Sequence, residues 1–180
     1  MKSAQAIILA AGLLVSGCTD NSGPAAAANT PMLIEPRVGV GKVRSGMTVQ
    51  QVVAELGEPQ RRTANALEYT RLGFAVMPAS NGPVRFVMCG DVIGIRGPLV
   101  KAFSGRTKEG IGMNSTREEV VKAYGEPAES ERFRGGLESM QYPSLGITFT
   151  LEGGKVHHMI VRLGPSQEPD RTISIEPAQK

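Results

Sequence analysis

The residues that could carry acid–base, nucleophilic or metal chemistry are few in this chain of 180 residues. The only two histidines, His157 and His158, are adjacent in a run that predicts a strand, so their side chains point to opposite faces and cannot chelate one ion together. If Met159 faces the core, His157 shares that side and His158 is exposed. There is no Gly-x-Ser-x-Gly, His-Glu-x-x-His or phosphate-binding lysine loop, and Gly39-Val40-Gly41 lacks the third glycine of a dinucleotide loop. We therefore expect a protein that is not an enzyme and that uses no metal and no cofactor.

Cys18 has the clearest chemical assignment. It follows a positively charged start, a short apolar run from Ala6 to Val15 and two small residues. Val15-Ser16-Gly17-Cys18 resembles the bacterial lipobox, in which a membrane peptidase cuts before a cysteine whose thiol carries lipid. The apolar run is shorter than the about 20 residues that span a bilayer. The sequence therefore predicts a signal peptide over residues 1–17, lipid on Cys18, and sorting to the outer membrane because Thr19 follows the cysteine.

The composition of the remaining chain limits its partners. The net charge of +3 comes from 20 basic and 17 acidic residues without a block of Lys or Arg, which argues against nucleic-acid binding. Residues 18–37 predict a flexible tether, and residues 165–180 predict a polar tail. Cys89 is the one cysteine left after lipidation, so no intramolecular disulfide can form. An inert buried thiol and a reactive or intermolecular thiol both stay open for Cys89.

A sequence repeat relates residues 46–59 to residues 112–127, and both copies end in Gly-Glu-Pro. In each copy a threonine precedes a Gln or Glu by three residues, which is the spacing of a helix capping box. The pairs are Thr48 with Gln51 and Thr116 with Glu119. Valines follow at helical spacing, and Gly57 and Gly125 stand where a left-handed C-terminal cap is expected. Each copy therefore predicts a short helix with a defined start and end, and the repeated Glu58 and Glu126 are exposed residues of a stop signal.

Strand patterns follow each predicted helix. They cover residues 67–70, 73–77 and 84–89 in the first half, and 138–142, 146–151 and 155–163 in the second. A helix followed by an antiparallel meander, twice, predicts an α+β fold. Its two tandem repeats, residues 38–97 and 98–164, would pack their helices on one face of a curved sheet.

The Gly-Met-Thr, Val-Val and Leu-Gly-Glu-Pro elements of this repeat resemble those of the BamE/SmpA-type small outer-membrane assembly lipoproteins. As a tandem pair, the copies are also similar to the duplicated architecture of the β-lactamase-inhibitor-protein fold. The resemblance covers roughly residues 38–163. It implies a helical hairpin on an antiparallel sheet, a place in the cell envelope and a protein partner.

Together, these features predict an outer-membrane-anchored periplasmic lipoprotein that binds or scaffolds another envelope protein without catalysis. If the open face of the sheet is the contact surface, strand parity selects the contact residues. They are Arg85, Thr148, Thr150, His158 and Arg162. The alternative is an inhibitor of a hydrolase, which requires an exposed apolar or aromatic hot spot. A third possibility is a hydrolase with a polar pocket that the sequence does not reveal. No nucleic acid or small-molecule substrate is expected.

Overall fold

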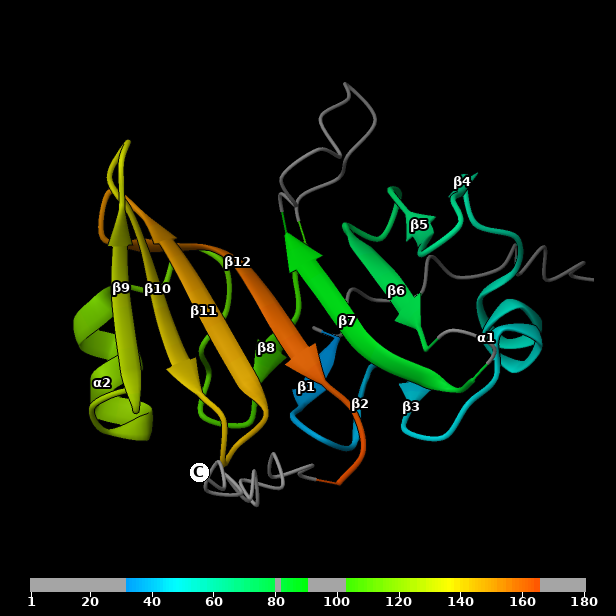
Figure 1. Ribbon diagram of the computed structural model, residues 1–180, viewed down its shortest axis with the longest axis horizontal. Coiled ribbons are helices and arrows are strands. Elements are labelled where there is room, and N and C mark those ends of the chain that lie inside the picture. The colour runs from blue at the N-terminus through cyan, green and yellow to red at the C-terminus, as the bar shows by residue number, and fades with distance from the viewer. Residues whose placement is uncertain (1–31, 80–81, 91–102, 166–180) are drawn as a thin grey trace, which may run out of the picture. The chain divides into compact units, whose positions relative to one another are not determined.

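The computed structural model describes residues 32–79, 82–90 and 103–165 (Figure 1). The chain divides after Thr30, and the described residues all belong to the part that follows. Cys18, the predicted signal peptide, most of the predicted tether and nearly all of the predicted tail lie outside the described residues. Within the described part, no helix is long and apolar enough to cross a bilayer.

The two predicted helices and their capping boxes are confirmed. Helix α1 spans Val49–Leu56 and helix α2 spans Arg117–Tyr124. At the start of α1, the Thr48 hydroxyl accepts a hydrogen bond from the Gln51 amide at 3.3 Å, and the Gln51 side chain accepts one from the Thr48 amide at 2.8 Å. The same pair of bonds joins Thr116 and Glu119 at the start of α2. Each box therefore satisfies two of the amides that a helix start leaves without a partner.

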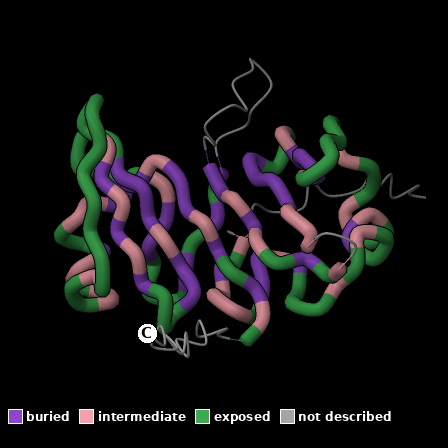
Figure 2. The backbone as a smooth tube through the Cα atoms, viewed as in Figure 1, coloured by how far each residue is buried: buried purple, intermediate pink, exposed green. Residues whose placement is uncertain are grey.

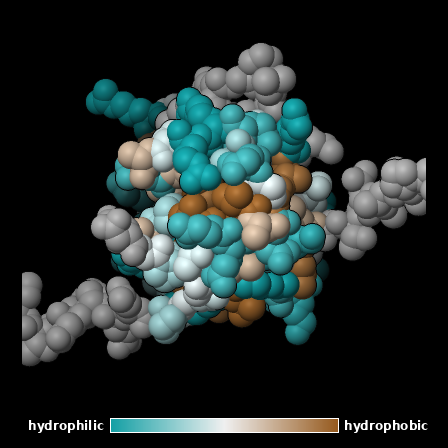
Figure 3. All heavy atoms as spheres, turned by 90° about the vertical axis from the view of Figure 1, so that its right-hand side faces the viewer, coloured by the Kyte–Doolittle hydropathy of each residue, from teal (hydrophilic) through white to brown (hydrophobic). Residues whose placement is uncertain are grey.

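The helices bury one narrow stripe each. Val52 and Val120 are fully buried, whereas Val49, Val53 and Leu56 of α1 are packed against the core but only partly buried. Figure 3 looks at the end of the molecule that carries α1 and shows apolar side chains gathered among mostly polar ones. A helix of eight residues is thus too short to cover the core by itself, and other elements must complete it.

The helix ends differ from the predicted left-handed caps. Gly57 has φ 79° and ψ −176°, and Gly125 has φ 78° and ψ −172°. These angles lie in an extended region at positive φ that glycine alone adopts readily, not in the left-handed helical region. In both helices the glycine amide still donates to the carbonyl four residues earlier, Val53 in α1 and Val121 in α2. The chain therefore leaves each helix extended and enters the sheet directly.

We expect Gly57→Ala and Gly125→Ala each to lower the free energy of unfolding by about 1–3 kcal/mol, which is the cost of holding an unfavourable backbone conformation. An added Cβ at either position meets nothing within 4 Å, so the loss would come from the backbone and not from a clash. Urea denaturation measures it. Gln50→Ala, at an exposed position of α1, is the matched control and should change stability by less than about 0.5 kcal/mol. Unfolding of Gly57→Ala at the wild-type urea midpoint would refute this assignment.

One eight-stranded sheet runs through the described part of the chain, and all of its neighbouring strands are antiparallel. In spatial order the strands are β4 (Arg61–Arg62), β5 (Leu67–Tyr69), β6 (Phe74–Pro78), β7 (Val84–Gly90), β12 (Lys155–Arg162), β11 (Ile147–Glu152), β10 (Leu137–Tyr142) and β9 (Glu129–Phe133). Strands from the two halves of the chain meet where β7 pairs with β12, at Val87 opposite Val161 and Cys89 opposite Met159. These four side chains are fully buried.

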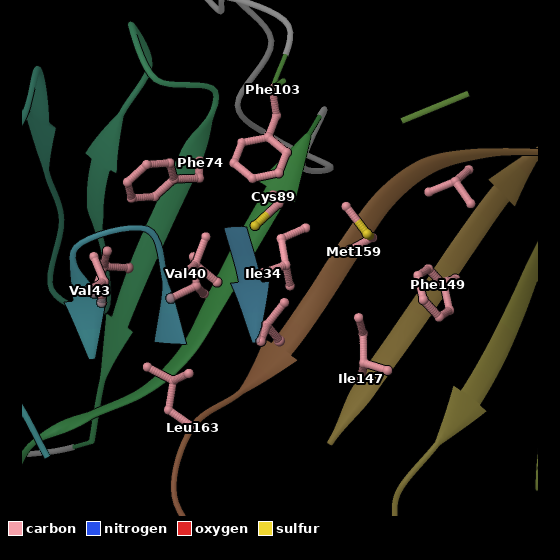
Figure 4. Packing of buried hydrophobic residues seen from close by; sticks show 14 of the residues in the cluster. Ile34, Val40, Val43, Phe74, Cys89, Phe103, Ile147, Phe149, Met159 and Leu163 are labelled. Atoms are coloured by element: carbon pink, nitrogen blue, oxygen red, sulfur yellow. The ribbon is translucent and has the colours of Figure 1, made fainter. Parts of the chain in front are cut away.

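A second, four-stranded sheet supplies the rest of the core. Its spatial order is β3 (Val43–Arg44), β2 (Gly39–Val40), β1 (Leu33–Glu35) and β8 (Arg106–Thr107), with β1 and β8 parallel. Ile34, Val40 and Val43 are at most 1% exposed and belong to the same core cluster as the buried face of the large sheet. Figure 4 shows Ile34 and Val40 beside Cys89 and Met159. The small sheet thus covers the part of the large sheet that the two helices leave open.

The predicted fold class is wrong. Strands account for 46% of the described residues and helices for 13%, in two helices of eight residues each. The protein is therefore mostly β, and it is not an α+β pair of helix-plus-meander repeats packed through helices. Two findings account for the error. Strands from both halves of the chain join into one sheet where β7 pairs with β12. A second sheet covers much of the large sheet's buried face, which the prediction had covered with helices alone. The predicted tether is also too long, because β1 lies within residues 18–37 and Ile34 is fully buried.

Candidate interaction surface

The two faces of the large sheet have different environments. Along β7 and β12, Val87, Cys89, Met159 and Val161 point into the core. Residues at alternate positions point to the opposite side, which we call the outer face; at the centre of the sheet it consists of Phe86, Met88, Gln141, Thr148, Thr150, His158, Ile160 and Arg162. Figure 2 shows the resulting alternation of buried and partly buried residues along these strands. Both helices lie on the core side, since Tyr69 and Tyr142 reach their C-terminal ends from that side.

Two arginines flank one aromatic ring on the outer face. The guanidinium carbon of Arg162 lies 5.0 Å from the centroid of the Phe86 ring, and that of Arg85 lies 5.6 Å from it. Both distances allow a favourable interaction between the cation and the electron-rich face of the ring. Arg85 and Arg162 are exposed, while Phe86 is half-buried. Three side chains from two neighbouring strands thus form a preorganised cationic and aromatic group.

A local irregularity of β7 places Arg85. Phe86 pairs with Met77, but the next pair joins Val84 to Pro78, so Arg85 is an extra residue on its strand. Such a bulge redirects a side chain relative to the regular pleat. Strand parity alone would put Arg85 on the same side as the buried Val87, and the bulge is the local reason that it does not follow that alternation.

Two hollows adjoin this group. A small one of about 70 Å³ is lined by residues that include Phe86, Gln141, Thr148, Ile160 and Arg162. A larger and more open one of about 390 Å³ is lined by Arg85 and Arg162 together with residues that include Ser45, Val84 and Gly164. Arg162 therefore borders both hollows, one partly apolar and one next to both guanidinium groups.

The five predicted contact residues differ in how far they are exposed. Arg85, Thr148 and Arg162 are exposed or partly exposed at the centre of the outer face. Thr150 and His158 pair across β11 and β12 but are only 9% and 5% exposed, and the Thr150 hydroxyl lies 3.4 Å from His158 Nε2. These two residues therefore present little surface to a partner, and their contact with one stays a prediction. Parity gave the correct face for both, but it does not determine exposure.

The predicted environments of the two histidines are wrong. A bulge between Thr150 and Leu151 shifts the register, so Val156 occupies the core position opposite Leu151 and is 1% exposed. His157 is the extra residue, half-buried, with Nδ1 3.4 Å from a Glu152 carboxylate oxygen. His158 is buried where exposure was predicted. The extra residue in the strand accounts for the environment of His157, whereas the burial of His158 comes from what surrounds the strand.

Sequence reasoning missed a contact that recurs in both halves. The Tyr69 hydroxyl donates to the Gly57 carbonyl at 3.1 Å, and the Tyr142 hydroxyl donates to the Gly125 carbonyl at 2.9 Å. Burial raises the pKa of both tyrosines, so the hydroxyls remain donors. Each bond ties the end of a helix to the sheet beneath it. The signal was present as a second shared motif, Tyr-x-x-Leu-Gly, at residues 69–73 and 142–146.

Three other features of the described residues could have carried chemistry: the Cys89 thiol, a group of metal ligands and a hollow beside α2. The Cys89 side chain is fully buried, and burial raises the pKa of its thiol, which disfavours the reactive thiolate. Among the described residues, no three His, Cys, Asp or Glu side chains are grouped as metal ligands would be. A hollow of about 510 Å³ beside α2 is lined by charges of both signs, including Arg106, Glu109 and Lys122. Tyr124 donates to Glu109 there at 2.7 Å, and this hydrogen bond lowers the pKa of the carboxyl group.

Comparisons with known proteins place the chain in no established family. No protein-family model matches the sequence, and no curated protein matches it. Among solved structures, the chain is similar to a DUF4309 family protein (YjgB) from Bacillus subtilis subsp. subtilis str. 168. The two share 15% sequence identity with a TM-score of 0.43, over 64% of this chain and 78% of that chain.

Proposed function

We propose that this protein is an outer-membrane-anchored periplasmic lipoprotein that acts as a non-catalytic protein-binding or scaffolding module in the cell envelope. Its anchor is lipid on Cys18, and its binding surface is the outer face of the large sheet. The observation that carries the proposal is the group formed by Phe86 and the two arginines that flank it.

The composition of this group supports protein binding. Aromatic residues and arginines are enriched among the side chains that contribute most to protein–protein affinity. Here they project from β7 and β12, two paired strands whose alternate side chains are packed in the core. Because the strands are already ordered, binding would lose little backbone entropy. A rigid platform with few protruding groups suits a module that holds a partner in place.

The proposal can be tested in intact cells by site-specific photo-crosslinking. A photoreactive amino acid would replace Gln141 or Thr148, which border the small hollow, in the full-length lipoprotein. Matched controls would carry it at Gln50 of α1 or Glu118 of α2, exposed positions on helices that cover the core side. We expect a discrete adduct from the outer-face positions and none from the helices. Adducts from the helix positions alone would refute the assignment of the binding surface.

A further inference from the structure

We propose that the outer face recognises an acidic and apolar polypeptide segment of its partner. A carboxylate of that segment would bridge Arg85 and Arg162, and a neighbouring small apolar side chain would enter the hollow beside Phe86. This inference rests on the proposed function and specifies the chemistry of the partner.

The charge balance of the surface points to an anionic ligand. Among the described residues, no ion pair within 4.0 Å includes Arg85 or Arg162. Other arginines of the described part are paired; examples are Arg44 with Glu35, Arg61 with Glu68, and Arg117 with Glu138. Both cations stand over the same ring, so two positive charges gather at one place on the outer face. A carboxylate beside the ring would balance this charge and could accept charge-assisted hydrogen bonds from both guanidinium groups.

The small hollow indicates that the ligand carries an apolar group as well as a negative charge. Its volume of about 70 Å³ and its lining by Phe86 and Ile160 suit a small apolar side chain. Gln141 and Thr148, paired across β10 and β11, stand at the same hollow and offer hydrogen-bonding groups to a peptide backbone. A phosphate-rich polymer would satisfy the arginines but leave this apolar lining in water. A peptide segment with a carboxylate close to an apolar side chain satisfies both.

The test is selection from a phage-displayed library of random 12-residue peptides against the full-length lipoprotein in detergent. We expect the selected peptides to carry net negative charge, with an apolar residue close to a carboxylate. The best peptide should bind the Arg85→Gln/Arg162→Gln variant about 10- to 100-fold more weakly, as loss of charge-assisted hydrogen bonds predicts. Arg71→Gln/Arg134→Gln, a matched change at exposed arginines in turns, should bind within about twofold of wild type. Wild-type circular dichroism and urea midpoints for both variants would show that the fold is intact.

Three results would overturn the inference. They are selection of neutral or basic peptides, absence of any enriched peptide, and equal binding of the best peptide to the Arg85→Gln/Arg162→Gln variant. Inorganic polyphosphate serves as a parallel probe. If it binds more tightly than every selected peptide and depends on the same arginines, the surface recognises a polyanion instead. The photo-crosslinking test separates this failure from failure of the proposed function, because a specific outer-face adduct would show a protein partner whatever chemistry that partner uses.

Discussion

Cys18→Ser is expected to incorporate no labelled fatty acid and to leave the membrane for the soluble periplasmic fraction. The lipobox-like segment, residues 15–18, presents a thiol for alkylation, and a serine hydroxyl is a much weaker nucleophile at neutral pH. Each methylene of an acyl chain adds about 0.8 kcal/mol to membrane binding, so the loss of several chains releases the protein completely. Metabolic labelling with a fatty acid, followed by membrane fractionation, measures both effects.

Cys89→Ala is the control for this prediction. It removes the other cysteine of the chain, which is fully buried in the core, and should leave fatty-acid labelling unchanged. Purified Cys18→Ser should unfold at the urea concentration of the wild-type protein, because position 18 lies outside the unit that starts at Pro31 and holds the described core. Labelled fatty acid on the Cys18→Ser protein would show that the anchor lies elsewhere.

The helices could be predicted from the sequence because their signals are local. A capping threonine, its Gln or Glu partner and the terminal glycine all lie within about ten residues of one another. All six predicted strands within the described residues were also located to within about two residues; β10, for example, buries every second residue as its sequence pattern indicates. Strand β9, whose five residues are all exposed, was not predicted. Such features need no knowledge of the rest of the chain.

The architecture could not be predicted because it depends on distant pairings. Strands β2, β3 and β8 have two residues each, too few to show an alternating pattern. The parallel pairing of Leu33 with Arg106 joins segments more than seventy residues apart. The pairing of β7 with β12 likewise merges both halves into one sheet. None of these contacts leaves a local signal.

The candidate surface was predicted in part, for a related reason. Parity on β11 and β12 correctly identified the exposed faces of Thr148 and Arg162. It failed to anticipate the burial of His158, which depends on the surroundings of the strand and not on its alternation. Phe86 was missed because residues 84–89 form an almost continuous apolar run. Only the register with β12 shows that its ring faces outward beside Arg162.

Reversal of both arginine charges has the largest expected effect on binding. In Arg85→Glu/Arg162→Glu the surface would change from two cations to two anions and would repel a carboxylate instead of attracting it. Loss of a charge pair at an interface costs about 2–5 kcal/mol, which corresponds to about 30-fold or more in affinity. Both side chains are exposed, so the free energy of unfolding should change by less than about 0.5 kcal/mol. Arg71→Glu/Arg134→Glu makes the same change in net charge away from the outer face and serves as the control.

The decisive measurement is the amount of partner crosslinked to each variant in intact cells and recovered with the full-length protein. If the outer face is the binding surface, recovery should fall at least about tenfold for Arg85→Glu/Arg162→Glu and stay near wild type for Arg71→Glu/Arg134→Glu. Equal recovery from both double variants, with urea midpoints unchanged, would contradict the assignment of partner binding to Phe86 and its two flanking arginines.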